Sequence, residues 1–112
     1  MVSGHDLPTP FEVRLRPDRD RLLVAPRGEL DIATADQMSA ALLEQFDNGF
    51  EHVVADLRDV TFIDSTGIRV LWQAHRRSEQ DGKRLSLIPG NGNVGRALQM
   101  TGLLERMDLL DR

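Results

Sequence analysis

The sequence predicts an α/β protein with a mixed β-sheet backed by helices, in the order β-β-α-β-α-β-α. Three observations predict it: a pair of strand-like segments near the start, a later alternation of strand-like and helix-like segments, and a nearly continuous apolar segment at residues 52–57. Strands that alternate with helices become parallel neighbours joined by right-handed crossovers. An antiparallel hairpin added to such strands gives a sheet of mixed direction.

A hairpin opens the predicted domain. Residues 1–10 contain two prolines and are expected to form a flexible N-terminal tail, which leaves residues 11–112 as a single domain. Residues 11–16 alternate apolar and polar side chains, as half-buried strands do. Turn-forming residues 17–20 separate them from a second apolar segment, residues 22–25, so the two segments form an antiparallel pair.

Helical periodicity predicts three helices. The first begins with a capping box, in which Thr34 accepts the backbone N–H of Gln37 and the Gln37 side chain reaches back, and it ends at residues 48–49. The third is capped by Asn93 and follows a short strand at residues 85–88. The second helix carries an apolar stripe formed by Ile68, Leu71, Trp72 and His75.

Composition excludes several functions. The 112 residues include no Cys and carry a net charge of −4, which excludes disulfides and thiolate metal sites and argues against a nucleic-acid partner. The three His are dispersed without a metal-ligand spacing, and no apolar segment is long enough to span a membrane. We therefore expect a cytoplasmic protein with no metal, no cofactor and no membrane association.

The most informative segment is residues 63–68, at an expected strand-to-helix turn. Ser65 occupies or adjoins the helix N-cap, where its hydroxyl can accept a free backbone N–H. Two interpretations stay open from this pattern: an ordinary cap and a phosphorylation switch. A phosphate adds about 1.5 to 2 negative charges next to the positive end of a helix dipole, so it leaves the fold intact. It also lies beside Asp64, and Asp31 and Asp56 are expected to end nearby.

Two motifs carry a resemblance to a known family. Residues 64–67 read Asp-Ser-Thr-Gly with Ile68 behind them, and residues 28–31 read Gly-Glu-Leu-Asp, followed by Thr-Ala at residues 34–35. The sequence resembles the anti-sigma factor antagonists, the stand-alone form of the domain shared with sulfate transporters (STAS domain). The resemblance runs from about Phe11 to the end and includes the order of elements, so it implies a STAS-like fold.

The resemblance also implies a function without catalysis. Members of this bacterial family bind an anti-sigma factor, often itself a serine kinase, and so free a sigma factor for transcription. Phosphorylation at the position of Ser65 prevents this binding, and a serine phosphatase restores it; Thr66 is a candidate second site. Asp31 matches the acidic residue beside the serine. The expected partner-binding residues are Asp31, Asp64, Ser65, Thr66, Gly67, Arg69 and Trp72.

Trp72 has two interpretations that the sequence leaves open. It is the only Trp of the chain, and it lies either in the core or partly exposed as an anchor for a partner. Arg69 is expected on the solvent side of the same helix.

Three other functional patterns in the sequence are incomplete. Residues 90–95 have dinucleotide-binding spacing, but too little chain follows for a ribose-binding strand, so a glycine-rich turn is favoured. Ser65 lacks the Gly-x-Ser-x-Gly frame of a hydrolase. Asp56 and Asp59 suggest a phosphoacceptor of the response-regulator kind, but the only Lys, Lys83, precedes the last predicted strand.

Two alternatives to the antagonist remain distinguishable by experiment. A scaffold subunit of a larger signalling assembly would oligomerise, whereas the antagonist is expected to be a monomer or weak dimer. A nucleotide-binding protein that uses residues 90–95 would bind ATP or GTP without a partner.

Overall fold

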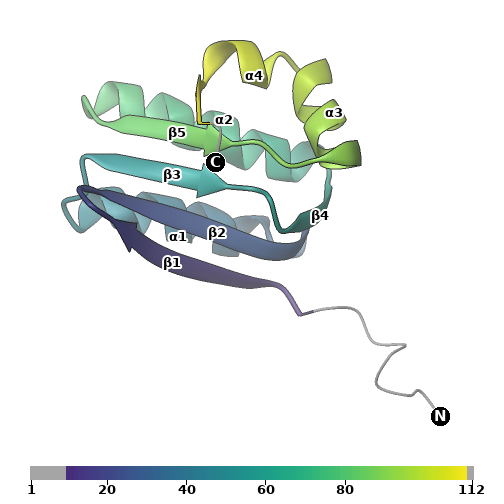
Figure 1. Cartoon of the computed structure of the whole chain (residues 1–112), viewed down its shortest axis with the longest axis horizontal. Coiled ribbons are helices and arrows are strands. Elements are labelled where there is room, and N and C mark those ends of the chain that lie inside the picture. Colours follow the sequence, from purple (N-terminus) through teal and green to yellow (C-terminus); the bar gives the residue numbers. More distant parts are fainter. Residues whose placement is uncertain (1–9, 111–112) are drawn as a thin grey trace.

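A six-stranded mixed sheet forms the centre of the fold, and helices cover one of its faces (Figure 1). The structure is a computed structural model that describes residues 10–110. The strands are β1 (Glu12–Asp18), β2 (Arg21–Leu30), β3 (His52–Asp56), β4 (Val60–Ile63), β5 (Arg84–Ile88) and β6 (Asp108–Leu109). The helices are α1 (Ala35–Asp47), α2 (Ser65–Gln80), α3 (Gly92–Met100) and α4 (Leu103–Arg106).

The strand order confirms the predicted mixed sheet. The order is β1-β2-β3-β5-β6, with β1 antiparallel to β2 and every later pair parallel. All seven predicted elements are present in the predicted order. The structure adds β4, α4 and β6, which the sequence analysis did not separate from the connecting segments.

The length of β2 determines where the functional segments meet. The first half of β2 pairs with β3, and its last residues pair with β4, where Leu30 lies opposite Ile63. The ends of β2 and β4 therefore lie side by side. The first motif, residues 28–31, spans the end of β2, and the second, residues 64–67, follows β4, which brings the two motifs together at one edge of the sheet.

The main core lies between the sheet and the helices α1 and α2, which lie behind the sheet in Figure 1. Each fully buried Leu, Val or Phe side chain contributes about 1.5–3 kcal/mol relative to exposure. The predicted central strand is confirmed, since Val53, Val54 and Ala55 are all fully buried. A smaller cluster on the opposite face contains Leu23, Val54 and Ile88, with Leu110 packed against it.

Two predicted helix caps are wrong. Thr34 makes no side-chain cap bond to α1; its hydroxyl accepts the backbone N–H of Asp31 at 3.0 Å and donates to the Glu29 carbonyl at 2.8 Å. The turn that precedes α1 therefore takes the hydroxyl that a capping box would use. Asn93 lies inside α3, which has Asn91 at its N-cap, and its side chain instead accepts a bond from Arg96.

The buried face of α2 is rotated from the predicted stripe. Leu71 is fully buried, as predicted. Ile68, Trp72 and His75 are only half-buried. The fully buried positions of the helix are Gly67, Val70, Leu71, Ala74 and Ser78. The stripe therefore lies on one flank of the buried face and not at its centre.

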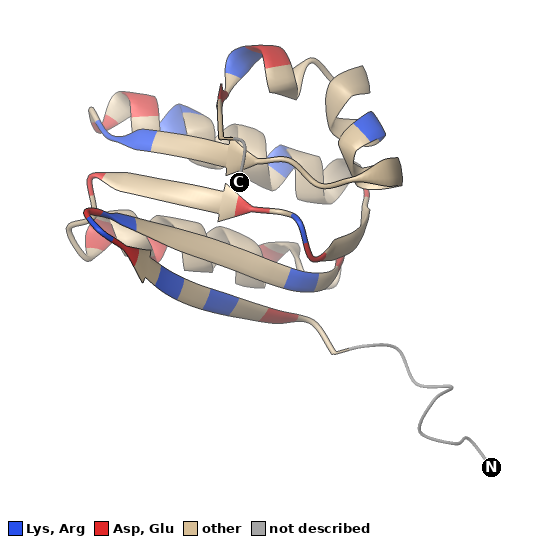
Figure 2. Cartoon of the chain, viewed as in Figure 1, with Lys and Arg blue, Asp and Glu red and all other residues tan. Residues whose placement is uncertain are grey.

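Charges of both signs are interspersed over the described part of the chain (Figure 2). No helix within residues 10–110 has the length and apolar composition of a membrane span. The same residues contain no cluster of His, Cys, Asp or Glu that could hold a metal ion. The predicted tail, residues 1–10, lies outside the described residues except for Pro10.

Candidate functional site

The candidate site lies where β2 and β4 end. The backbone N–H of Asp64 donates to the Leu30 carbonyl at 3.2 Å, which ties the residue after β4 to the last residue of β2. Asp31 follows Leu30 directly, and Ser65 follows Asp64 as the first residue of α2. The structure therefore brings Asp31, Asp64 and Ser65 to one edge of the sheet, as the sequence analysis expected.

Asp64, and not Ser65, caps α2. Its extended backbone (φ −112°, ψ −174°) directs the carboxylate back over the helix start, where Oδ1 accepts the N–H groups of Thr66 at 2.9 Å and Gly67 at 3.1 Å. Ser65 adjoins the cap and is exposed. Its hydroxyl forms no hydrogen bond with residues 10–110, so it is accessible to another protein.

Gly67 holds the helix start against the strands. A Cβ at this position would lie 2.7 Å from the Leu30 carbonyl oxygen and 2.9 Å from Ile63 Cγ1. Gly67 is buried, so it positions the exposed residues around it. Thr66, beside it, is half-buried.

Asp31 organises a turn of its own. Its Oδ1 accepts the backbone N–H of Ala33 at 3.0 Å, and its carbonyl accepts the N–H groups of Thr34 and Ala35 at 3.1 and 2.8 Å. Ile32 stands at the tip of this turn and is 80% exposed. Ile32 was not among the residues predicted from the sequence, although its place directly after Asp31 in the motif was a signal that could have identified it.

Arg69 and Trp72 extend the site along α2. Arg69 is exposed, as predicted, while Trp72 is half-buried against the core, with its ring 6.4 Å from that of His75 in an edge-on arrangement. Arg77 donates to Asp47 at the end of α1, which identifies the flank of α2 that faces α1. At 100° per residue, Ser65 and Trp72 lie on a different flank, away from α1.

Asp56 does not belong to this site, which corrects an expectation. Asp56 directly follows Ala55, which pairs with Val24 near the middle of β2. Ser65 comes shortly after Ile63, which pairs with Leu30 at the end of β2, so the two residues lie at different levels along β2. Its carboxylate accepts two bonds from the Arg58 guanidinium, at 2.9 and 2.7 Å. Burial raises the pKa of Asp56, but the hydrogen bonds and charge of Arg58 outweigh it and lower the pKa below its usual value.

The glycine-rich segment at residues 90–95 is a packing turn. A Cβ on Gly95 would lie 2.6 Å from the Gly90 carbonyl oxygen, and one on Gly90 would lie 2.7 Å from Val94. These contacts explain Gly90 and Gly95 by the close approach of α3 to the end of β5, while Gly92 has a positive φ of 57°. Both features favour the turn interpretation over nucleotide binding.

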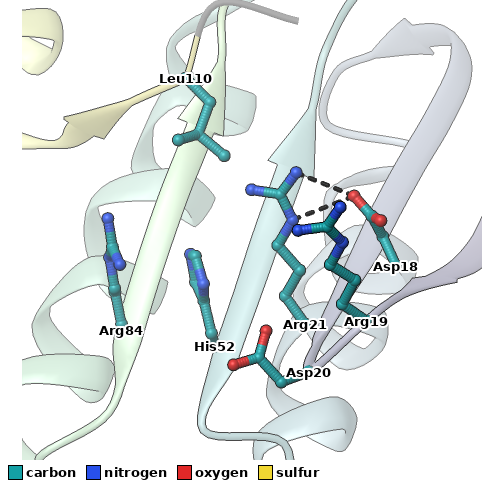
Figure 3. A pocket seen from close by; sticks show the side chains of 7 residues that line it. All are labelled: Asp18, Arg19, Asp20, Arg21, His52, Arg84 and Leu110. Atoms are coloured by element: carbon teal, nitrogen blue, oxygen red, sulfur yellow. Dashed lines mark hydrogen bonds and ion pairs between the residues drawn. The ribbon is translucent and has the colours of Figure 1, made fainter.

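A cavity of about 510 Å³ lies at the opposite end of the strands (Figure 3). Arg21, His52 and Arg84, the first residues of β2, β3 and β5, line it. Two of its cations are already paired: Arg21 with Asp18 at 2.8 Å and Arg84 with Asp108 at 2.7 Å. Because these carboxylates compensate the charge, the cavity is not a strong anion site.

A hydrogen-bonded chain adjoins this cavity, and the sequence analysis missed it. The buried Ser86 hydroxyl lies 2.7 Å from His52 Nε2 and donates to the Asp108 carboxylate. Burial, together with the charges of Arg84 and Arg21, lowers the pKa of His52, against the opposing effect of Asp108 and Asp20. Only the pairing of β5 with β6 reveals this cluster, since its members are far apart in sequence.

Comparisons with known proteins agree with the fold. Residues 12–111 match the family model of the STAS domain. An anti-sigma F factor antagonist of Paenibacillus polymyxa is 30% identical over 102 residues, which are 90% of this chain and 87% of the relative. An anti-sigma factor antagonist structure from Mycobacterium paratuberculosis has a TM-score of 0.82 at 21% identity, covering 95% of this chain and 92% of its own. The Bacillus cell fate determinant SpoIIAA in its phosphorylated form has a TM-score of 0.67 at 20% identity, covering 92% and 93%. The chain therefore belongs to the STAS domain family.

Proposed function

We propose that this protein is an anti-sigma factor antagonist: it binds an anti-sigma factor through the surface around Ser65 and releases it when Ser65 is phosphorylated. Release of the antagonist leaves the anti-sigma factor free to hold its sigma factor, so the switch regulates transcription. The protein needs no catalytic activity of its own for this role. It acts in the cytoplasm as a single domain of residues 11–112.

The observation that carries the proposal is the exposure of Ser65 at the first position of α2, beside Asp64 and at the same edge of the sheet as Asp31. A kinase can reach an exposed hydroxyl that has no competing hydrogen bond. The N–H groups of Thr66 and Gly67 are already bonded to Asp64, so a phosphate on Ser65 would extend toward solvent and toward a partner. This geometry supports a signal that another protein senses at the surface.

The physical effect of the phosphate is unfavourable for a closed interface. It adds about 1.5 to 2 negative charges and three oxygens where a partner would pack against Asp31 and Asp64. Burying a dianion among carboxylates without a compensating cation from the partner has a desolvation penalty of several kcal/mol. A penalty of about 4 kcal/mol corresponds to roughly a thousandfold weaker binding.

The relatives support the same role. The Paenibacillus polymyxa relative is named as an anti-sigma F factor antagonist, and SpoIIAA has been solved in a phosphorylated form. We extend both features to this chain: the partner is an anti-sigma factor that is also a serine kinase, and a serine phosphatase removes the phosphate. Asp31, Asp64, Thr66, Arg69 and Trp72 complete the binding surface, with Gly67 as the residue that positions it.

The test measures phosphorylation and binding together. The protein is incubated with ATP and, one at a time, with purified anti-sigma factor kinases from the same genome, and its intact mass is measured; its binding to each kinase is measured by isothermal titration before and after phosphorylation. We expect one phosphate on the wild type and none on Ser65→Ala, while Thr66→Val still accepts one. A phosphate lost in Thr66→Val but retained in Ser65→Ala would instead assign the switch to Thr66. No phosphate and no binding with any kinase would contradict the proposal.

A further inference from the structure

Ile32 is an exposed aliphatic side chain at the edge of the candidate site. Within residues 10–110, five large apolar residues are exposed to solvent; their exposed fractions are 50% for Leu15, 80% for Ile32, 47% for Phe62, 86% for Met100 and 42% for Leu109. A single exposed apolar residue needs no explanation by itself. Ile32, however, stands two residues after Leu30, whose carbonyl holds the N–H of Asp64, directly before Ser65.

The turn beneath Ile32 is held from both sides. Asp31 accepts backbone N–H groups through both its side chain and its carbonyl, and the Thr34 hydroxyl accepts the Asp31 N–H while it donates to Glu29. These bonds fix the backbone of the residue that they enclose. A side chain on a preorganised turn loses little conformational entropy on binding, which favours its use as a contact residue.

The charges around Ile32 are acidic and not compensated. Glu29, Asp31, Asp36 and Asp64 lie on the segments that flank it, and none of them forms an ion pair with the residues that the structure describes. The acidic partners in those ion pairs are Glu12, Asp18, Asp47, Asp56, Glu79, Asp81 and Asp108. A complementary partner would therefore present an apolar pocket with Lys or Arg at its rim.

We propose that Ile32 is an apolar anchor of the partner-binding surface, which inserts into a pocket of the anti-sigma factor that has basic residues at its rim. The inference rests on the proposed function and specifies the contact that provides affinity. The basic groups face Glu29 and Asp36, which flank Ile32, and do not face Ser65. No basic group of the partner then faces the phosphate, which agrees with its disruptive effect; the nearest exposed cation along α2 is Arg69 of this chain, one helical turn after Ser65.

The geometry also separates the anchor from the switch. Interface energy concentrates in a few side chains that fill pockets on the partner, whereas charges at the rim mainly affect association rate and salt dependence. Ile32 would supply binding energy by filling a pocket, and Glu29 and Asp36 would affect the association rate and its salt dependence. Ser65 would control whether the two surfaces can close.

The experiment is a graded series at Ile32, measured by isothermal titration against the anti-sigma factor kinase that phosphorylates the wild-type protein. We expect Ile32→Val to bind within about fivefold of wild type, Ile32→Ala to bind at least about tenfold more weakly, and Ile32→Asp to bind at least about a hundredfold more weakly. Leu15→Ala, at an exposed position opposite Val24 in the middle of β2, is the matched control and should bind as wild type.

A second measurement tests the chemistry of the partner. Stopped-flow association should slow as salt is raised, and Glu29→Gln combined with Asp36→Asn should reduce this salt dependence. Binding of Ile32→Ala within twofold of wild type would overturn the anchor, while the proposed function would stand if phospho-Ser65 still bound weakly. An absence of salt dependence would overturn the basic rim. Failure of the unmodified wild type to bind any of the kinases would overturn both proposals.

Discussion

Gly67 of α2 lies so close to Leu30 of β2 that no side chain fits between them: a Cβ on Gly67 would lie 2.7 Å from the Leu30 carbonyl oxygen. The same carbonyl accepts the N–H of Asp64 at 3.2 Å. Leu30 belongs to one sequence motif and Gly67 to the other. Their contact is the physical reason that both motifs contribute to one surface.

The first prediction concerns Gly67→Ala. In a helix interior this change is intrinsically favourable by about 1 kcal/mol. Here the added methyl group would clash with the Leu30 carbonyl and with Ile63, and overpacking of this kind destabilises by about 1–3 kcal/mol. We expect a net loss of stability in urea denaturation, with an unchanged m-value.

The control for Gly67→Ala lies on the exposed side of the same helix. Gln73→Ala removes an exposed side chain and should change the unfolding free energy by less than about 0.5 kcal/mol. If Gly67→Ala were as stable as wild type, the close approach of α2 to β2 would be wrong.

The second prediction concerns the cap of α2. Asp64→Ala removes the acceptor for the N–H groups of Thr66 and Gly67 and should destabilise the protein by about 0.5–2 kcal/mol. Asp64→Asn keeps an acceptor oxygen and should lose much less. Thermal unfolding of the two variants at equal concentration distinguishes them. Equal losses would show that the charge of Asp64, and not its cap geometry, stabilises the helix.

The sequence predicted those parts of the fold that depend on local patterns. Residues 52–57 are apolar nearly throughout, and a strand covered on both faces requires this, so β3 could be placed at the centre of the sheet. β4 was missed because it has only four residues, of which the middle two are exposed. The segment pairs with the end of β2, and such long-range pairing leaves no local pattern.

The sequence predicted which residues belong to the site better than it predicted how they are arranged. The prediction placed Ser65 at a strand-to-helix turn beside Asp64, and both features depend on adjacent residues. The Thr34 cap failed because Asp31 and Glu29 compete for its hydroxyl in the folded turn. Asp56 was expected to lie near Ser65, but only the register shows that β3 ends level with the middle of β2.

The third prediction concerns His52 and pH. Burial and the nearby Arg84 and Arg21 lower the pKa of His52 below its ordinary 6.5 in the folded protein, so the unfolded chain binds more protons. The unfolding free energy should therefore fall as the pH decreases from about 7 to about 5, because protonation favours the unfolded state. His52→Gln should reduce this fall, as measured by urea denaturation at several pH values.

A direct titration provides the control for His52. The ring resonances of His52 should titrate below pH 6.5 in wild type, and Arg84→Gln should move the midpoint upward by removing a neighbouring positive charge. A midpoint at or above 6.5 in wild type would contradict the position of His52 between the two arginines.

The last prediction separates a surface switch from a folding switch. Phosphate at the first position of α2 gains about 0.3–1 kcal/mol from the helix dipole and a smaller amount from exposed Arg69 four residues later, and repulsion from Asp64 opposes these gains. We therefore expect phospho-Ser65 protein to unfold within about 1 kcal/mol of the unmodified protein, with Ser65→Ala as the matched reference, in thermal and urea denaturation. A loss above about 2 kcal/mol would mean that the phosphate displaces Asp64 from the N–H groups of Thr66 and Gly67 and unwinds the helix start. Release of a partner would then follow from local unfolding of the helix start, and Asp64→Ala would weaken partner binding in the same way without any phosphate. If stability is unchanged and binding is lost, the phosphate acts at the surface where the partner closes over Ser65.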